Sequence, residues 1–367
     1  MTSDSKEIRL IGDELDRLYE ELTTEPTEPK SFDLTTDRIV IFSDQHRGAR
    51  NGADDFRRCE RAYNAALAYY YRMGYTLVVL GDAEELWEER PGSVIRTYRH
   101  TLELEARFHR AGRYLRVWGN HDDDWRFPDK VTRYLAPIFG ERPLPVPEGY
   151  LFDMRHNGER LGELLLVHGH QGSATSDRFA GVSKFFVRYL WRPFQRLTNY
   201  SVNTPATDWS LREARDRGMQ GWAASQPAPT VVICGHTHRP VFASQTHADQ
   251  LARELDAVRD QLETRPDDQT LRVEASLLEA EIEWVRAQEH QEPGAEGSPE
   301  PAPPHYFNTG CCSFLDGDVT GFELADGEIR LIRWPDNDGA PTPHVLRSAL
   351  LADVYGALRQ DETAAEA

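Results

Sequence analysis

Residues 39–46 read IVIFSDQH, and this stretch decides how the rest of the chain is interpreted. The four apolar residues at its start have the length and composition of a buried strand, and Asp44 and His46 follow at the strand's end. The same arrangement recurs in LVVLGDAEE (77–85), YLRVWGNHD (114–122), LLLVHGH (164–170) and VVICGHTH (231–238). Strand after strand delivers oxygen and imidazole side chains to one edge of a sheet. We therefore expect these groups to converge on metal ions.

The segments between the apolar runs indicate an α/β protein. From residue 37 to about residue 140, apolar runs alternate with amphipathic stretches such as 54–73, which ends at Gly74 as a helix C-terminus often does. This alternation is typical of a layered α/β domain. Further along, 319–324 and 329–334 predict a hairpin of two strands.

Composition shifts divide the chain into six parts. We expect an N-terminal helical arm and linker, a core with a basic aromatic insertion, a helical hairpin, a disordered linker, the last strands of the core, and a tail with a short helix. Their bounds are 1–30, 31–246 with the insertion at 178–207, 247–290, 291–304, 305–340 and 341–367.

The insertion at 178–207 contains no Asp or Glu, although carboxylates make up a sixth of the chain. Lys184, Arg188, Arg192 and Arg196 recur in it every four residues among aromatic side chains. Such a stretch could bind a phosphorylated lipid, with 178–196 lying against an anionic membrane surface. It could equally cover the acidic core by charge complementarity. Both interpretations remain open.

The segment 247–290 predicts two antiparallel helices. Their apolar stripes are separated by a turn at 265–268 and consist of Leu251, Leu255, Val258 and Leu262 in the first helix and Leu277, Leu278, Ile282 and Val285 in the second. The hairpin could be a lid, an arm or a homodimer contact. The alternative is that the hairpin is a solvent-exposed appendage with none of these roles.

The formal net charge of −19 argues against a duplex nucleic acid partner. No apolar run approaches the roughly 18 residues that cross a bilayer, and the first residues lack the features of a signal peptide. We therefore expect a cytoplasmic protein. The four cysteines show neither disulfide-framework nor zinc-site spacing, so we interpret them as structural.

Two adjacent divalent cations need carboxylate to offset their repulsion, and a bridging carboxylate serves both. Asp82 is our candidate for that bridge. Asp44 and His46 are two residues apart, so both can face one ion only where the chain leaves strand geometry. His236 and His238 pose the same requirement, and this pair could serve two ions.

The cluster at 119–122 offers both a ligand and an acid. Asn120 supplies a neutral carbonyl oxygen, which suits a site already rich in anions. His121 follows it and could protonate a leaving alkoxide as a general acid. Asp122 could hold the His121 ring and raise its pKa. We therefore predict that His121 and Asp122 are catalytic.

Taken in order, the motifs DxH, GDxxE, GNHD, HGH and GHTH resemble those of the calcineurin-like metallophosphoesterase superfamily, over roughly 37–238 and the strands after Phe307. The resemblance implies a four-layer αββα sandwich of two mixed β-sheets flanked by helices, with two divalent metal ions at the strand ends. One ion would be held by Asp44, His46, Asp82 and His238, and the other by Asp82, Asn120, His168 and His236. A hydroxide between the ions would attack phosphorus, with His121 near the scissile phosphate.

Residues 80–87, LGDAEELW, also resemble the GDxxExW pattern of the UDP-2,3-diacylglucosamine pyrophosphatase branch. Enzymes of that branch act on a lipid-bearing nucleotide sugar and carry a basic apolar insertion. The chain departs from the branch at His170, where Asp is usual, at Arg47, where an apolar residue is usual, and in having the segment 247–290. The resemblance implies a small or lipid-linked phosphorylated substrate.

Three further residues are candidates for substrate binding. Arg47 and Asn51 follow the first ligand pair and could hold a phosphate, since a guanidinium matches phosphoryl geometry; a surface salt bridge is the alternative for Arg47. His170 could contact substrate or fix a neighbouring ligand. Glu85 is expected to orient loops. Mn²⁺ is the first choice of metal, and Fe or Zn²⁺ also suits these ligands.

The sequence as a whole predicts a metal-dependent phosphoesterase that hydrolyses a phosphate ester or pyrophosphate on a lipid-linked or nucleotide substrate. Two alternatives remain. The first is a catalytically silent interaction scaffold with the same fold, against which the complete ligand set and His121 argue. The second is a single-strand nuclease that uses the basic stretch 178–196.

Overall fold

The structure is a computed structural model. It describes residues 3–24, 29–51, 54–172, 209–246, 251–252, 255–256, 258–259, 261–262, 265, 268–289, 303–314 and 316–365. The basic aromatic insertion expected at 178–207 and residues 291–302 of the expected linker lie outside the described residues. None of the helices within the described ranges has the length and apolar character that crossing a membrane requires.

A six-stranded sheet carries the first three motifs. Its order is β13-β12-β11-β2-β3-β4. The strands are β2 (Ile39–Phe42), β3 (Thr76–Leu80), β4 (Tyr114–Val117), β11 (Val319–Ala325), β12 (Glu328–Trp334) and β13 (His344–Leu350). β2, β3 and β4 are parallel, so their C-terminal ends lie at one edge. β11 pairs antiparallel with β2, which places the late hairpin beside the first motif strand.

A seven-stranded sheet carries the last two motifs. Its order is β1-β5-β6-β7-β10-β8-β9. The strands are β1 (Lys30–Asp33), β5 (Gly149–His156), β6 (Glu159–Val167), β7 (Thr230–Cys234), β8 (Pro240–Phe242), β9 (Gln245–Thr246) and β10 (Tyr306–Thr309). β6, β7 and β10 are parallel neighbours, whereas β5 and β8 run antiparallel to β6 and β10.

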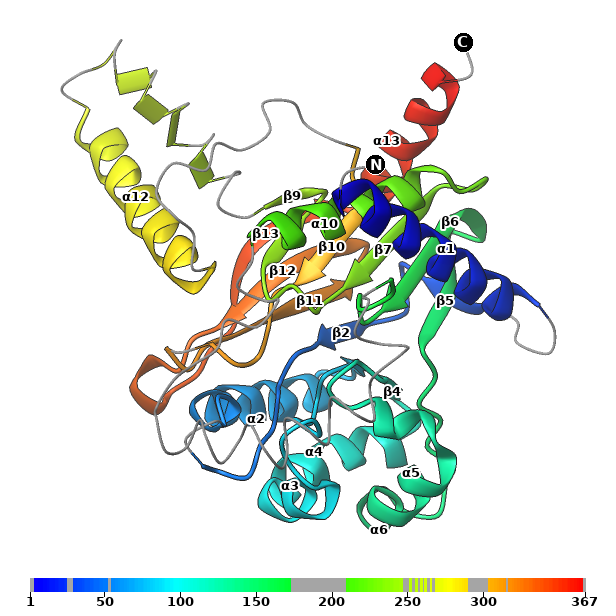
Figure 1. The fold of residues 1–367 in the computed structure, drawn as a ribbon. Coiled ribbons are helices and arrows are strands. Elements are labelled where there is room, and N and C mark those ends of the chain that lie inside the picture. The colour runs from blue at the N-terminus through cyan, green and yellow to red at the C-terminus, as the bar shows by residue number, and fades with distance from the viewer. Residues whose placement is uncertain are drawn as a thin grey trace.

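Helices cover the outer face of each sheet (Figure 1). The seven-stranded sheet is covered by α1 (Ser3–Thr23) and α10 (Trp209–Ala224). Beside the six-stranded sheet lie α2 (Phe56–Arg72), α3 (Pro91–Thr97), α4 (Arg99–Arg110), η1 (Asp123–Arg126), α5 (Pro128–Tyr134) and α6 (Ala136–Phe139). The expected four-layer αββα sandwich of two mixed sheets is confirmed.

The alternation of side chains along each strand explains the apolar runs. In β2, Val40 and Phe42 belong to the core shared with α2 and α4, whereas Ile39 and Ile41 belong to the core between the two sheets. Both faces of such a strand are buried, so it needs apolar residues at every position. The core between the sheets is closed by residues of α13 (Leu351–Ala365), including the fully buried Tyr355.

The N-terminal helix is more than the expected arm. Ile11, Leu15 and Leu18 of α1 are buried in one core with Leu165 of β6 and Trp222 of α10. The Trp222 Nε1–H also donates to Asp16 of α1 at 2.8 Å. α1 is therefore part of the outer layer of the sandwich, and β1 already begins at Lys30, inside the segment expected to be a linker.

The C-terminal tail expected from residue 341 is corrected by β13. Residues 344–350 pair with β12 and form the edge of the six-stranded sheet. The strand was missed because none of its residues is buried, and Val345 and Leu350 are exposed. An edge strand without a buried face lacks the alternating pattern from which strands are predicted.

The helical hairpin insertion is confirmed. α12 (Gln269–Glu289) packs against the described residues of 251–262, which are helical. Leu251, Leu255 and Val258 share a small core with Leu271 and Ala275, separate from the three cores of the sandwich. An ion pair between Arg259 and Glu279 joins the two helices at 2.9 Å. A homodimer contact through this hairpin stays a prediction.

Candidate metal centre

The candidate ligands lie on loops from both sheets. The loops after β2, β3 and β4 carry Asp44, His46, Asp82, Asn120 and His121, and the loops after β6 and β7 carry His168, His236 and His238. Three groups of these residues have ligand atoms within 4.8 Å of one another: Asp44, His46 and His238; His46, Asp82 and His121; and Asp82, His168 and His236. Because His46 and Asp82 each belong to two groups, the three groups form one cluster.

An uncommon backbone conformation turns these side chains toward one another. Asp44, His46, Asp82, His236 and His238 all have positive φ, between 47° and 70°. Residues other than glycine rarely adopt this left-handed region, which costs about 1–3 kcal/mol per residue and is concentrated at functional sites. It confirms that both members of the Asp44/His46 pair and of the His236/His238 pair leave strand geometry, as the sequence required.

Three glycines let the backbone approach the ligands closely. A Cβ on Gly119 would lie 2.6 Å from the Asp82 backbone nitrogen and closer still to its Oδ1. A Cβ on Gly81 would lie 2.6 Å from Cγ of His168, and one on Gly235 would collide with the Asp44 carboxylate. The glycine in each of these motifs is therefore a steric requirement of the neighbouring ligand.

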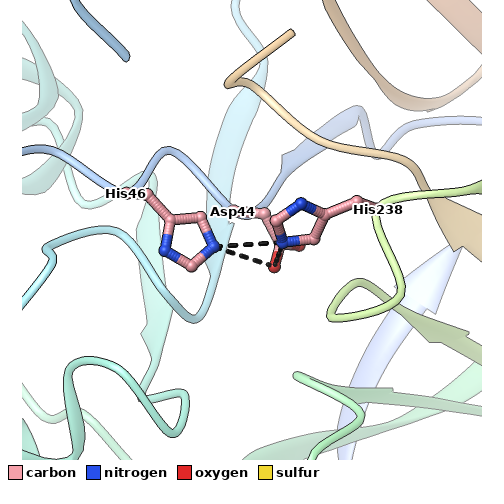
Figure 2. Close-up of side chains that lie close together, drawn as sticks. All are labelled: Asp44, His46 and His238. Carbon is pink, nitrogen blue, oxygen red and sulfur yellow. Dashed lines mark hydrogen bonds and ion pairs between the residues drawn. The ribbon is translucent and has the colours of Figure 1, made fainter. Parts of the chain in front are cut away.

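Asp44, His46 and His238 form the first ligand group (Figure 2). The Nε2 atoms of the two histidines are 3.1 Å apart, and Asp44 Oδ1 lies 3.2 Å from His238 Nε2. Ligand atoms about 2.1 Å from one ion are separated by roughly 3.0–3.4 Å, so this spacing suits a shared cation. The other Asp44 oxygen accepts hydrogen bonds from the Ser43 hydroxyl and, at 3.0 Å, the His236 backbone N–H.

Asp82, His168 and His236 form a second group. His168 Nε2 lies 3.1 Å from Asp82 Oδ2, and His168 Nδ1 donates to the Leu80 carbonyl at 2.9 Å. That carbonyl can only accept, so the Nδ1 atom carries the proton and the Nε2 lone pair is free for a cation. The same Asp82 oxygen is 3.8 Å from His46 Nε2 of the first group. Asp82 therefore stands between the two groups, as a bridge must.

Asn120 has the orphan oxygen that a ligand would show. Among the described residues, its buried Oδ1 atom has no hydrogen-bond partner. The surrounding backbone is fixed, because Trp87 Nε1–H donates to the Asn120 carbonyl at 2.5 Å and the next N–H, of His121, donates to Asp82 at 2.8 Å. A buried amide oxygen left without a donor costs free energy unless a cation satisfies it.

Glu85 orients two imidazole rings. Its Oε2 atom lies 2.7 Å from His121 Nδ1 and 3.2 Å from His46 Nδ1. Both Nε2 atoms are consequently free to face the cluster. The Trp87 ring stacks on His121 at 4.9 Å. Glu85 was expected only to orient loops, although its place in GDxxE, next to a ligand strand, was the signal for a role beside the ligands.

Asp122 does not hold the His121 ring, which corrects the sequence prediction. Its buried carboxylate accepts the backbone N–H groups of Gly119 at 2.7 Å and Ala83 at 3.0 Å, and it pairs with Arg116. Burial raises the pKa of Asp122 to about 7, although the Arg116 charge opposes that rise. Asp122 ties the loop after β3 to the loop after β4.

Arg47 is likewise unavailable to a substrate, which corrects its assignment. The side chain is fully buried, and its guanidinium pairs with Glu105 at 2.7 Å and Glu84 at 3.1 Å and donates to the Ala83 carbonyl. The alternative of a surface salt bridge is also wrong, because both carboxylates are buried.

The two remaining candidates for substrate binding differ in exposure. Asn51 is half-buried and donates to Glu89 at 2.7 Å. His170 is buried, with its ring 4.8 Å from Trp118 and 5.5 Å from His168. Burial lowers the pKa of His170 to about 3, so the ring is neutral at ordinary pH. This packing favours a role in fixing His168 over contact with a substrate.

The electrostatics of the cluster favour added positive charge. Burial by itself would lower the pKa of His168, but the Asp82 carboxylate outweighs it and raises the pKa to about 9. His46 behaves in the same way next to Asp44 and Glu85. The carboxylates thus stabilise protons on these histidines, and they would attract cations to the same positions. Metal binding releases such protons, so the donor set and its charge both fit divalent ions.

Comparisons with known proteins find a family model that matches the chain. A family model described as "Calcineurin-like phosphoesterase" matches residues 37–240, more than half of the chain. No curated protein sequence matches significantly. Among solved structures, the crystal structure of a dimetal phosphatase from Danio rerio is similar at 11% identity, with 85% of this chain and 100% of that chain covered and a TM-score of 0.31. At that score the similarity supports no conclusion on its own.

Proposed function

The chain belongs to the calcineurin-like phosphoesterase family, and on that premise we propose that it hydrolyses a phosphate ester or pyrophosphate with two divalent metal ions. The observation that carries the proposal is the position of Asp82. One of its oxygens lies 3.1 Å from His168 Nε2 and 3.8 Å from His46 Nε2, between two ligand groups that each combine residues from both sheets. A single carboxylate shared in this way is what a pair of adjacent cations requires.

The ligands divide between the two ions as follows: Asp44, His46, Asp82 and His238 hold one, and Asp82, Asn120, His168 and His236 hold the other. The groups of Asp44, His46 and His238 and of Asp82, His168 and His236, together with the orphan oxygen of Asn120, support this division. When bound, the ions would supply a nucleophilic water of lowered pKa and would offset negative charge on the phosphoryl oxygens. Mn²⁺ remains our first choice, with Fe or Zn²⁺ as alternatives.

His121 acts as the proton donor to the leaving group. The side chain is 24% exposed, more than those of Asp44 and His46, so substrate can reach it. Burial would lower its pKa, but Glu85 and Asp82 outweigh burial and raise the pKa, which favours the protonated ring. The bond to Glu85 occupies Nδ1 and leaves Nε2 to deliver the proton.

The experiment that tests this function is hydrolysis of an aryl phosphate by metal-loaded wild type and by His121→Ala. We expect the variant to keep both metals, as measured by elemental analysis, and to lose about 10²–10⁴ in kcat. Loss of a metal together with activity would make His121 a ligand rather than an acid. Wild type as inert as the variant would favour the silent scaffold.

The substrate is a lipid-linked or nucleotide phosphate in this proposal. The GDxxExW pattern supports it, because its tryptophan, Trp87, stacks on the proposed acid His121 at the edge of the site. Turnover of a UDP-linked sugar with and without acyl chains tests the assignment. A strong preference for the acylated compound supports the pyrophosphatase branch, and equal turnover of both with a simple aryl phosphate argues against it. Cleavage of single-stranded DNA would favour the nuclease.

A further inference from the structure

A hollow of about 410 Å³ is lined by residues of α4 and α6. These two helices belong to the layer outside the six-stranded sheet (Figure 1). Its lining includes five charged or titratable side chains of α4 together with apolar residues. The charged or titratable residues are Arg99, His100, Glu103, Arg107 and Arg110, and the apolar residues include Leu104 and Ile138. None of these residues belongs to the metal centre.

Two of the guanidinium groups have no carboxylate partner among the residues that the structure describes. Arg99 pairs with Glu103 at 2.8 Å. Within the described part of the chain, Arg107 and Arg110 make no ion pair. Arg107 instead lies over the Tyr71 ring at 4.4 Å, and Arg110 donates one N–H to the Ile138 carbonyl at 3.2 Å. Each guanidinium has five N–H donors, so these contacts hold the two groups in place and leave most donors free.

The local charge is opposite in sign to that of the whole chain. Residues 90–142 contain eleven Lys or Arg and seven Asp or Glu, a net charge of +4, whereas the whole chain carries −19. Like charges three residues apart on a helix repel, and Arg107 and Arg110 are three apart. This repulsion is unfavourable within the chain and would be relieved by a bound anion.

We propose that this hollow binds an anion that carries a phosphate or phosphonate group and an apolar part. Arg107 and Arg110 would hold the phosphoryl oxygens, because a guanidinium fork matches that geometry. The apolar part would lie over Leu104 and Ile138. The volume falls within the range of small-ligand sites. The chemistry is common to soluble phosphate esters and lipid headgroups, and it does not depend on the proposed function of the metal centre.

Calorimetric titration of the metal-loaded protein with phenylphosphonate tests the proposal, because this probe has no ester bond to hydrolyse and any binding at the metal centre is common to wild type and the variants, so their difference reports the hollow. We expect wild type to bind it at the hollow and Arg107→Ala/Arg110→Ala to bind it there at least ten-fold more weakly, with aryl phosphate turnover unchanged. A control, Arg9→Ala/Arg57→Ala, removes the same charge from two exposed arginines elsewhere and should bind like wild type. Equal weakening by the control would overturn the proposal.

A second variant guards against misfolding of the first. Glu103→Gln releases Arg99 from its carboxylate, and we expect it to bind phenylphosphonate several-fold more tightly. Co-sedimentation with phosphatidic acid vesicles identifies the source of the ligand. If wild type binds the vesicles, the double variant does not, and the soluble probe binds weakly, the ligand is a lipid headgroup. If neither probe distinguishes these variants from wild type, the hollow is not an anion site.

Discussion

Several positions around the metal centre are glycines, which have a hydrogen atom where other residues have a side chain. Gly119 is the closest case, because a Cβ at this position would collide with the carboxylate of Asp82, the residue that stands between the two ligand groups. The position of that carboxylate is therefore set by backbone packing as well as by its own hydrogen bonds. A single methyl group at residue 119 would have to displace either the loop or the carboxylate.

We predict that Gly119→Ala loses metal. The new Cβ would lie 2.6 Å from the Asp82 nitrogen, a contact that cannot be accommodated without movement. Elemental analysis should find well under two ions per chain, and hydrolysis of an aryl phosphate should fall at least ten-fold. Gly221→Ala in α10 is the control, since its Cβ meets nothing within 4 Å, and it should keep metal and activity. A fully loaded Gly119→Ala protein would refute the steric argument.

Glu85 should matter through the rings that it orients. Glu85→Gln keeps the shape but removes the charge that holds His121 and His46 by their Nδ1 atoms. We expect kcat to fall about 10–100-fold, the usual cost of losing such a support. The pKa of the general acid His121, measured from the pH–rate profile, should also fall, because Glu85 raises that pKa. Glu141→Gln, at an exposed position, is the control; an unchanged profile in Glu85→Gln would contradict the assignment.

Individual residues show where sequence reasoning succeeds and where it stops. Asp44 and Asp82 directly follow apolar strands, and that position alone indicated their place at the sheet edge. Arg47 and Asp122 are just as close to the motifs, yet their side chains turn into the protein and hold loops together. The direction of a side chain on an irregular loop depends on φ and ψ, which the residue types do not reveal.

At the scale of elements, α1 and α10 support the loop that carries His168. Arg215 of α10 is buried and donates from NH1 to the carbonyls of Gly169 at 2.8 Å and Gln171 at 3.0 Å. Its NH2 pairs with Glu7 of α1 at 3.3 Å. The N-terminal helix therefore contributes to the metal centre through a buried arginine, without reaching it.

Replacing that arginine should affect one ion more than the other. In Arg215→Ala the His168 loop loses two anchoring hydrogen bonds, whereas the loop with Asp44 and His46 is unaffected. Titration with Mn²⁺ should therefore show one site weakened about ten-fold or more and one close to wild type. Arg217→Ala, at an exposed position of the same helix, is the control. Equal weakening of both sites would show a general loss of structure instead.

The elements themselves were predictable in proportion to their burial. Strands buried on both faces, such as β2, β3 and β7, appear in the sequence as unbroken apolar runs. β13 lacks a buried face and gave no such signal. The helical character of α1 was evident, but its place over the seven-stranded sheet was not. Spacing reveals that a helix has an apolar face, and the tertiary structure decides what covers it.

At the scale of the whole molecule, the candidate ligands join two sheets. One sheet supplies Asp44, His46, Asp82 and Asn120, and the other supplies His168, His236 and His238. Ions that bind only the folded arrangement stabilise it by about 2.7 kcal/mol when the free metal is 100 times its Kd. We expect chelation to lower Tm and to speed amide exchange in the loops of both sheets. Faster exchange confined to one sheet would show that the ions do not join them.

The effect of pH should differ between metal-free and metal-loaded protein. In the metal-free protein Asp82 raises the pKa of His168 to about 9, from about 6.5 in an unfolded chain. The stability that this proton contributes is complete below about pH 6.5 and is lost as the pH rises to about 9. A cation replaces the proton, so metal affinity rises over the same range.

We therefore expect the difference in Tm between Mn²⁺-loaded and chelated protein to widen from pH 6.5 to 9. Calorimetry in buffers of different ionisation enthalpy should also show that metal binding releases protons. Asn157→Asp, which adds a carboxylate on an exposed turn, is a suitable control for this comparison. Asn308→Asp is not suitable, because it alters a buried hydrogen-bond network below the site. A difference in Tm that is constant with pH would contradict the prediction.

The strand order has a consequence for biosynthesis. Every candidate ligand precedes residue 239, yet β2, which leads into Asp44 and His46, gains its second neighbour only when β11 pairs with it. A nascent chain stopped before residue 319 would have all the ligands and only half of the sheet that positions four of them. Assembly of the centre should accordingly await translation of the last strands, so a ribosome-stalled chain ending near residue 310 should fail to retain metal.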